Sequence, residues 1–217
     1  MELSDEYRRC WEIASQFPLD KEVAYPEMAE IHEFDLVRGK QVLEYGCGNG
    51  SDTLSFLKRG AKVWFADIVP LNVETTSRRV REAGFEVHPL LLEESDDIRV
   101  EDGSFDIIYA NGVLHHIENV TPVVAELARV IRLEGTLFAM LYTEFLWKRC
   151  LLQIEARIVA GVSKTPEQAF CTITDYGAPY ARAYTEEEGK QLFEGFVVRA
   201  TALWNGSDFR TFKAVRL

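Results

Sequence analysis

Residues 41–50 read QVLEYGCGNG, and residues 61–67 read AKVWFAD. Two short apolar runs thus flank a glycine-rich turn, and the segment between them starts a helix at Ser51. This order predicts a strand, a tight loop, a helix and a second strand, which together form one βαβ unit with a parallel strand pair. The free N–H groups at the start of the helix point toward the glycine loop. This unit therefore predicts a ligand site at the loop.

The glycine spacing indicates which nucleotide-type ligand fits. A dinucleotide fingerprint G-x-G-x-x-G would place its third glycine at position 51, which is serine. The chain instead reads E-x-G-x-G-x-G over residues 44–50, with an acid before the first glycine. An acid there opposes a phosphate and suits an ammonium group. Asp67 ends the second strand, where a carboxylate can accept hydrogen bonds from a ribose diol.

Strands and helices alternate through the middle of the chain. This alternation predicts an open parallel sheet with helices on both faces, and a ligand site at the carboxyl ends of its strands. After residue 185 a helix capped by Thr185 and an antiparallel hairpin are expected to close the sheet. The expected strands are 42–45, 63–66, 86–91, 105–110, 136–142, 196–202 and 209–215; the expected helices are 51–59, 73–83 and 122–130, with Gly135 breaking the last from its strand.

Two segments lie outside this alternation of strands and helices. Residues 3–17 and about 27–34 read as helices before the first strand, and we interpret residues 1–34 as a helical lid. Residues 145–159 read as an amphipathic helix, whereas 164–185 show little periodicity. A connection this long is usually functional. We therefore interpret residues 143–185 as a substrate-side insertion or cap on a single domain that spans residues 1–217.

Composition narrows the class of partner. The 217 residues carry a net charge of −11, which disfavours a nucleic-acid substrate and favours a small molecule. No apolar run approaches the roughly 20 residues that span a bilayer. The acidic N-terminus lacks the pattern of a signal peptide, so a cytoplasmic location is expected. The four cysteines are scattered without a C-x-x-C pair, which predicts free thiols and no metal site.

Three further motifs follow the glycine loop in order: FDIIYAN at 105–111, LHHI at 114–117 and ELARVIRLEGTL at 126–137. Together with the loop they resemble the class I S-adenosylmethionine-dependent methyltransferases. The resemblance spans residues 40–142 and is closest to the branch that includes ubiquinone and menaquinone biosynthesis enzymes and other small-molecule methyltransferases. One departure is the Leu-Glu-Gly turn at 133–135, where the family often has Pro-Gly. The resemblance implies a Rossmann-like, seven-stranded, mostly parallel sheet with a C-terminal antiparallel hairpin.

The resemblance also implies S-adenosylmethionine as cofactor and a role for each matching residue. The glycine loop would lie against the methionine and ribose parts, Asp67 would bind the ribose hydroxyls, and Ile68 would lie on the adenine. Glu94 or Ser95 would meet the adenine edge, although a solvated acidic loop also explains Glu94. Asn111 would contact the methionine end through its backbone. The full set of expected cofactor-binding residues is Tyr25, Glu44, Gly46, Cys47, Gly48, Gly50, Asp67, Ile68, Glu94, Ser95 and Asn111.

The expected chemistry is a one-step displacement in which the protein mainly aligns the reacting groups. A base is needed only where the attacking group loses a proton, and His115 and His116 are the candidates because histidine titrates near neutral pH. Adjacent positions point in different directions, so we expect one of the two, preferably His116, to face the pocket. The alternative is that both stabilise the loop. Further candidates for the pocket wall are Tyr142, Glu144 and Tyr176.

The sequence does not identify the methyl acceptor. Oxygen, nitrogen and carbon acceptors fit equally, as do a monomer and a homodimer. Two other classes of function are also compatible with the fold. One is a non-catalytic protein that binds the cofactor, and the other is a nicotinamide-dependent oxidoreductase, which Ser51 and Glu44 fit poorly.

Overall fold

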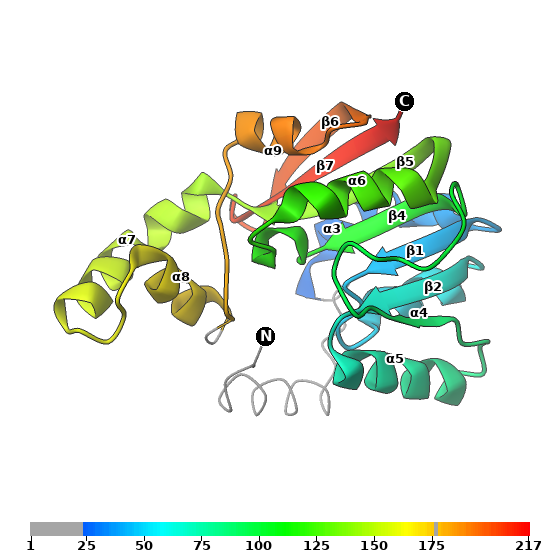
Figure 1. Cartoon of the computed structure of the whole chain (residues 1–217), viewed down its shortest axis with the longest axis horizontal. Coiled ribbons are helices and arrows are strands. Elements are labelled where there is room, and N and C mark those ends of the chain that lie inside the picture. Colours follow the sequence, from blue (N-terminus) through cyan, green and yellow to red (C-terminus); the bar gives the residue numbers. More distant parts are fainter. Residues whose placement is uncertain (1–23, 176–177) are drawn as a thin grey trace.

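The computed structural model describes residues 24–175 and 178–217 (Figure 1). The helix expected at 3–17 and the pocket-wall candidate Tyr176 lie outside these residues. The strands are β1 (Gln41–Tyr45), β2 (Lys62–Asp67), β3 (Pro89–Leu91), β4 (Phe105–Asn111), β5 (Ile131–Tyr142), β6 (Phe196–Trp204) and β7 (Phe209–Arg216). The helices are α3 (Pro26–Ile31), α4 (Ser51–Lys58), α5 (Pro70–Glu82), α6 (Val120–Val130), α7 (Glu144–Val159), α8 (Pro166–Asp175) and α9 (Glu186–Leu192), with 3₁₀ turns η1 (Phe34–Val37) and η2 (Leu114–His116).

The strands form one seven-stranded sheet in the order β3-β2-β1-β4-β5-β7-β6. The five strands from β1 to β5 pair in parallel. The hairpin β6–β7 adds to β5 in antiparallel orientation. The expected fold class is therefore confirmed, including the C-terminal hairpin. The strand order reverses between β1 and β4, which is where open sheets of this kind bind ligands.

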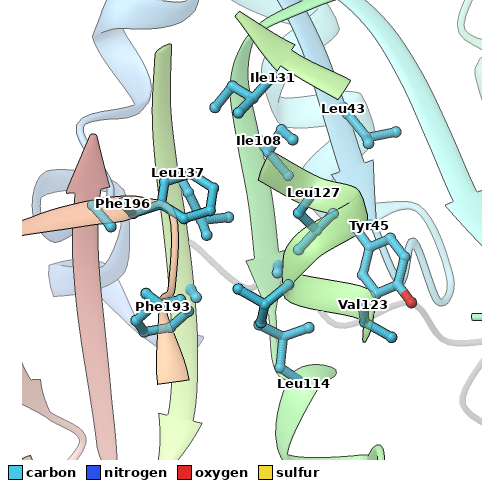
Figure 2. Packing of buried hydrophobic residues seen from close by; sticks show 14 of the residues in the cluster. Leu43, Tyr45, Ile108, Leu114, Val123, Leu127, Ile131, Leu137, Phe193 and Phe196 are labelled. Carbon is cyan, nitrogen blue, oxygen red and sulfur yellow. The ribbon is translucent and has the colours of Figure 1, made fainter. Parts of the chain in front are cut away.

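Side chains that alternate along the strands build a core on each face of the sheet. The first core contains Leu43, Ile108 and Leu137 and is covered by α6 and the end of α9 (Figure 2). The second core contains residues of the opposite parity, such as Val42 and Tyr109, and is covered by α3, η1, α4 and α5. The helices on both faces thus follow from the period-two pattern of the strands.

Helices α7 and α8 form a unit of their own after β5. They project beyond the sheet (Figure 1) and share a third core, which we call the cap core. The irregular structure expected at 164–185 is therefore partly wrong, because residues 166–175 are helical. Those residues pack Ala169, Phe170 and Cys171 against α7, and this tertiary contact outweighs their weak periodicity. The cap core contains Leu146, Cys150, Ile154, Ala169, Phe170, Cys171 and Ala181.

Gly135 does not separate the helix from the strand. Helix α6 ends at Val130, and β5 begins at the next residue. Gly135 lies within β5, where a Cβ would come within 2.6 Å of Ile131 Cγ1 and 2.8 Å of the Arg132 carbonyl oxygen. The glycine is therefore needed for close packing beside the register shift between Phe105 and Ile107.

Two other boundaries also differ from expectation. The helix expected at 27–34 ends at Ile31, because the chain turns at Glu33 with a φ of 50° before η1 begins. The strand expected from residue 86 starts at Pro89, because only three residues pair with the edge of β2. In the described part of the chain, no helix is long and apolar enough to cross a membrane.

Candidate cofactor and catalytic site

The glycine loop joins β1 to α4 in a conformation that requires glycine. Gly46, Gly48 and Gly50 have φ values of 82°, 52° and 78°, in the left-handed region. A Cβ at Gly46 would lie 2.7 Å from Val113 Cβ, and one at Gly50 would lie 2.8 Å from Thr76 Oγ1. Backbone conformation and close packing therefore both exclude a side chain at Gly46 and Gly50.

The loop is tied to the end of β2. The backbone N–H groups of Gly46 and Cys47 donate to the Ala66 carbonyl at 2.8 and 3.0 Å. The Thr76 hydroxyl of α5 donates to the Gly48 carbonyl at 3.1 Å, and the Arg79 guanidinium donates to the Asn49 carbonyl. These contacts fix the loop before any ligand binds, which is the preorganisation that a binding site needs.

Asp67 is buried at the end of β2 and connects the loop to α5. Its Oδ2 accepts from the Gly48 N–H at 3.1 Å and from Asn72 Nδ2 at 2.9 Å, and its Oδ1 accepts from the Val69 N–H at 2.9 Å. Burial raises the pKa of Asp67, and the hydrogen bonds from Val69, Asn72 and Gly48 offset part of that rise. The carboxylate thus faces the glycine loop from the end of β2.

Glu44 and Asp52 place two more acids beside the loop. Glu44 is buried and accepts a hydrogen bond from the Thr53 hydroxyl in the first turn of α4. Asp52, also buried, accepts from Asn111 Nδ2 at 2.9 Å. The two acids make this end of the loop negative, which suits a cationic ligand group and opposes a phosphate.

Asn111 carries an unsatisfied acceptor at the carboxyl end of β4. Its Nδ2 is held by Asp52 Oδ2 and lies 3.3 Å from Met28 Sδ. The contact with Asp52 fixes the orientation of the amide, because the carbonyl would be repelled by the carboxylate. Asn111 Oδ1 is buried and has no hydrogen-bond partner within the described residues. Such an atom in a native structure needs an explanation, and a donor on a bound ligand supplies one.

The adenine-side candidates lie at the ends of β2 and β3. Ile68 is 42% exposed, so its side chain is available to lie against a flat ring. The Ser95 carbonyl accepts a hydrogen bond from the Tyr45 hydroxyl at 2.6 Å, which fixes the loop after β3. Burial, reinforced by the charge of Asp67, raises the pKa of Tyr45, so this hydroxyl stays a donor. Glu94 is exposed beside Ser95.

Two expected cofactor contacts have other neighbours in the structure. Tyr25 packs edge-on against Trp204 and Phe209, with ring centroids 5.6 and 6.0 Å away. Cys47 is buried, and its Sγ lies 4.0 Å from Asp67 Oδ2. Burial raises the pKa of the Cys47 thiol, and the charge of Asp67 adds to that rise. Their roles toward the cofactor stay predictions.

The two histidines of η2 have different surroundings. His115 is fully buried, and its ring stacks on Tyr142 with centroids 3.7 Å apart. Burial and the neighbouring His116 hold the pKa of His115 well below its usual range, so this ring is neutral. His116 is only partly buried, and its Nδ1 lies 2.9 Å from the Tyr180 carbonyl. The structure thus places His116, and not His115, where a solute can reach it.

Asp175 at the end of α8 completes a polar group that sequence reasoning missed. Its Oδ1 accepts from the Tyr142 hydroxyl at 2.6 Å and lies 3.6 Å from His116 Nε2. The Thr174 hydroxyl donates to its Oδ2. Asp175 has no motif around it, and only the packing of α8 on α7 brings it to the carboxyl ends of β4 and β5. No pattern in the sequence alone locates it.

A pocket of about 480 Å³ lies beside the segment 180–185. The backbone of this segment contacts η2: the Arg182 N–H donates to the His115 carbonyl at 2.9 Å. Its side chains line the pocket together with residues of α7, α8 and α9. The lining residues are Glu144, Trp147, Lys148, Glu167, Tyr180, Ala181, Arg182, Ala183, Thr185 and Glu188. Of the pocket-wall candidates, Glu144 lies in this pocket, whereas Tyr142 belongs to the His116 group.

Comparison with known proteins identifies the fold and the domain. Residues 43–139 match the family model described as "Methyltransferase domain". The ubiquinone biosynthesis O-methyltransferase of Hahella chejuensis is 29% identical over 136 residues, which cover 62% of this chain and 56% of that protein. The chain thus spans about half the length of the curated relatives it matches, since the share is 42% for another such enzyme from Xanthomonas euvesicatoria.

Solved structures show the same fold at low sequence identity. A S-adenosylmethionine-dependent methyltransferase from Methanosarcina mazei aligns with a TM-score of 0.67 and 16% identity over 87% of this chain and 97% of that one. The 1,6-didemethyltoxoflavin-N1-methyltransferase of Burkholderia thailandensis, solved with S-adenosylhomocysteine, aligns with a TM-score of 0.61 and 17% identity over 100% and 92%. Residues 43–139 are thus similar to a methyltransferase domain, and the structure shares the fold of S-adenosylmethionine-dependent methyltransferases.

Proposed function

We propose that this chain transfers the methyl group of S-adenosylmethionine to a small-molecule acceptor. The observation that carries the proposal is the pairing of a buried acceptor without a partner, Asn111 Oδ1, with the preorganised glycine loop that Asp67 contacts from the end of β2. The ammonium group of the cofactor would donate a hydrogen bond to Asn111 Oδ1, and its ribose diol would donate to Asp67. The relatives and neighbours that bear methyltransferase names support the same reaction.

The cofactor, when bound, supplies a methyl group already activated on a sulfonium. The chain's own residues then hold and align the reactants. Asp67 would accept from the ribose hydroxyls, Asn111 Oδ1 would accept from the ammonium, and Ile68 would lie on the adenine. Alignment of this kind can supply several kcal/mol of the barrier reduction, so no covalent catalysis by the protein is required.

His116 is proposed to take the proton of an acceptor hydroxyl. A neutral His116 that donates its Nδ1–H to the Tyr180 carbonyl keeps the lone pair of Nε2 as the acceptor. Nε2 would take the proton from the acceptor oxygen, which makes that oxygen a stronger nucleophile toward the methyl group that the cofactor would supply. Asp175 Oδ1, 3.6 Å from Nε2, would stabilise the resulting imidazolium. This arrangement favours an acceptor that must lose a proton, and the printed name of the O-methyltransferase relative agrees.

The first test is calorimetric titration with S-adenosylmethionine, using wild type and Asp67→Ala, with NAD⁺ as the comparison ligand. Micromolar binding of S-adenosylmethionine that Asp67→Ala weakens at least tenfold supports the proposed site. Binding of NAD⁺ instead, or of neither ligand, contradicts it. Transfer of labelled methyl to phenolic, amine and carbon-acid acceptors then tests catalysis. Cofactor binding without transfer to any of them would favour a non-catalytic cofactor-binding protein.

The acidic composition is the basis of a further proposal. A net charge of −11 favours a small-molecule acceptor over a nucleic acid. Filter binding with DNA and RNA tests the acceptor class, and salt-sensitive micromolar binding would contradict it.

A further inference from the structure

Helix α7 carries a stripe of apolar side chains that no described residue covers. Its inner face packs Leu146, Cys150 and Ile154 into the cap core. On the outer face, Leu152 is 79% exposed and Val159 is 89% exposed. Phe145 on the same side is 40% exposed, so α7 presents three apolar side chains to solvent along its outer face, where a partner can bury them.

The stripe has the spacing of a helix–helix interface. Phe145, Leu152 and Val159 follow one another at intervals of seven residues, which aligns them along one line of the helix. Lys148 and Glu155 lie beside that line at the same interval. Lys148 lies over the Phe145 ring, 5.7 Å from its centroid. Neither Lys148 nor Glu155 forms an ion pair within residues 24–175 and 178–217.

The helix is held firmly enough to present this face. The Thr143 hydroxyl caps its N-terminus by accepting from the Leu146 N–H at 3.3 Å. Arg149 pairs with Asp208 at 2.8 Å and donates to the Gly206 carbonyl at 2.7 Å, which ties α7 to the turn between β6 and β7. The stripe is therefore a preorganised surface, which lowers the entropic cost of binding.

We infer that this stripe is the contact between two copies of the chain, with the two α7 helices antiparallel about a two-fold axis at Leu152. A two-fold contact joins the same patch on both copies, so the patch must be self-complementary. With the axis at Leu152, that residue meets its own counterpart. Phe145 of each copy then faces Val159 of the other, and Lys148 faces Glu155. The apolar line and the opposite charges therefore match only in the antiparallel orientation.

The test measures the oligomeric state of the full chain by sedimentation equilibrium. Wild type is expected to dimerise with a micromolar dissociation constant, because one helix pair is a small interface. Leu152→Glu is expected to weaken the dimer at least tenfold, since each copy would bury a charge at the axis. Lys148→Glu alone should also weaken it, and Lys148→Glu combined with Glu155→Lys should restore it. The matched control is Leu36→Glu, an exposed leucine of η1 that is 58% exposed and lies outside the stripe.

Three results would overturn the inference. If the wild-type chain stays monomeric throughout the micromolar range, a second copy of the chain is not the partner that binds the stripe. A dimer that persists in Leu152→Glu would be formed by another surface, such as the edge strand β6. Binding of wild type, but not of Leu152→Glu, to phosphatidylcholine vesicles with no dimer in solution would assign the stripe to a lipid surface. Circular dichroism of each variant confirms that α7 remains folded.

Discussion

Asp67 accepts hydrogen bonds from the Gly48 N–H, the Val69 N–H and Asn72 Nδ2 through both carboxylate oxygens, and one side chain thus shapes the loop and serves the proposed ribose contact. Asp67→Asn has a single acceptor oxygen, and its amide N–H₂ would face either the Val69 N–H or the Gly48 N–H. We expect the affinity for S-adenosylmethionine to fall at least tenfold, or about 1.4 kcal/mol. Calorimetry measures this, with Glu93→Gln as the control because Glu93 is an exposed acid paired with Arg99. Equal losses in both variants would contradict a specific role.

The pKa of Asp67 predicts how binding depends on pH. Burial raises this pKa, so protonation begins at a higher pH than for an exposed aspartate. Affinity for S-adenosylmethionine is expected to fall as the pH is lowered through the raised pKa, because a protonated carboxyl accepts hydrogen bonds poorly. The free energy of unfolding changes with pH in the opposite direction to the affinity. A carboxyl that binds its proton more tightly when folded makes the wild type more stable, relative to Asp67→Asn, as the pH falls.

Melting curves and calorimetry from neutral to mildly acidic pH check both signs in the same samples. If the affinity falls while wild type stays at least as stable relative to Asp67→Asn, the loss of affinity comes from protonation of Asp67 and not from general unfolding. If wild type and Asp67→Asn show the same pH dependence of both quantities, another group titrates in this range and the assignment to Asp67 is wrong.

Gly50 and Gly39 offer a matched pair for the loop. Both have positive φ, 78° and 72°, but a Cβ at Gly39 would have no atom within 4 Å, whereas one at Gly50 would lie against Thr76. Gly39→Ala is expected to cost only the backbone strain, about 1 kcal/mol. Gly50→Ala should cost at least about 1 kcal/mol more, because it also overpacks the loop. Urea denaturation measures both, and equal costs would show that the loop relaxes around the added methyl group.

At the scale of elements, α8 brings Asp175 to His116. Asp175→Asn keeps the shape but removes the charge that would stabilise the imidazolium. We expect kcat to fall about 10- to 100-fold with the affinity for S-adenosylmethionine unchanged. The control is Glu187→Gln, an exposed acid of α9 that does not line the pocket. The assay uses the acceptor identified by the methyl-transfer screen.

The affinity for S-adenosylmethionine and the circular dichroism spectrum distinguish a loss of chemistry from a loss of folding. Asp175→Asn is expected to leave both unchanged and to lower kcat alone, whereas a structural loss would change all three. If Asp175→Asn and Glu187→Gln behave alike, the proton-transfer role of the His116 group is contradicted.

Most elements of the sheet could be predicted because their periodicity is local. The strands from Val42 to Tyr142 and the hairpin after Phe196 show apolar runs bounded by turn residues, and their order alone indicates the parallel sheet. Helix α8 was not predicted, because its stability depends on packing against α7. Gly135 was misread as a helix stop, because a glycine that avoids a steric clash with Ile131 looks the same in sequence as one that ends a helix.

The residues of the candidate site also fall into those that the sequence predicts and those that it does not. The glycine loop and Asp67 are adjacent along one βαβ unit, so their spacing identifies them. The contact between His116 and Asp175 joins residues 59 positions apart through a helical insertion, and no spacing rule covers it. The unsatisfied Oδ1 of Asn111 is also invisible in sequence, because it follows from the orientation that Asp52 imposes on the amide.

At the scale of the whole molecule, the structure has two large cores on the sheet and a small cap core between α7 and α8. Stability is not uniform in such an arrangement, and a small unit with few buried side chains opens at a lower free energy than the sheet. Three buried cysteines report this difference. Cys150 and Cys171 lie in the cap core, whereas Cys47 lies in the second core beside Asp67.

We expect N-ethylmaleimide to label these thiols in two phases in a Cys10→Ser background. Burial raises the pKa of Cys171 to about 11, with a further contribution from Asp175, so the thiol is protonated at neutral pH and reacts only after the cap core opens. Cys150 and Cys171 are therefore labelled first, at a rate set by local opening of α7 and α8. Cys47 is labelled later, because its exposure requires the second core to open.

S-adenosylmethionine should slow the labelling of Cys47 alone, since a ligand that binds only the folded loop stabilises it by mass action. Mass spectrometry of peptides at increasing urea separates the three sites. Simultaneous labelling of all three would show that α7, α8 and the sheet unfold as one cooperative unit.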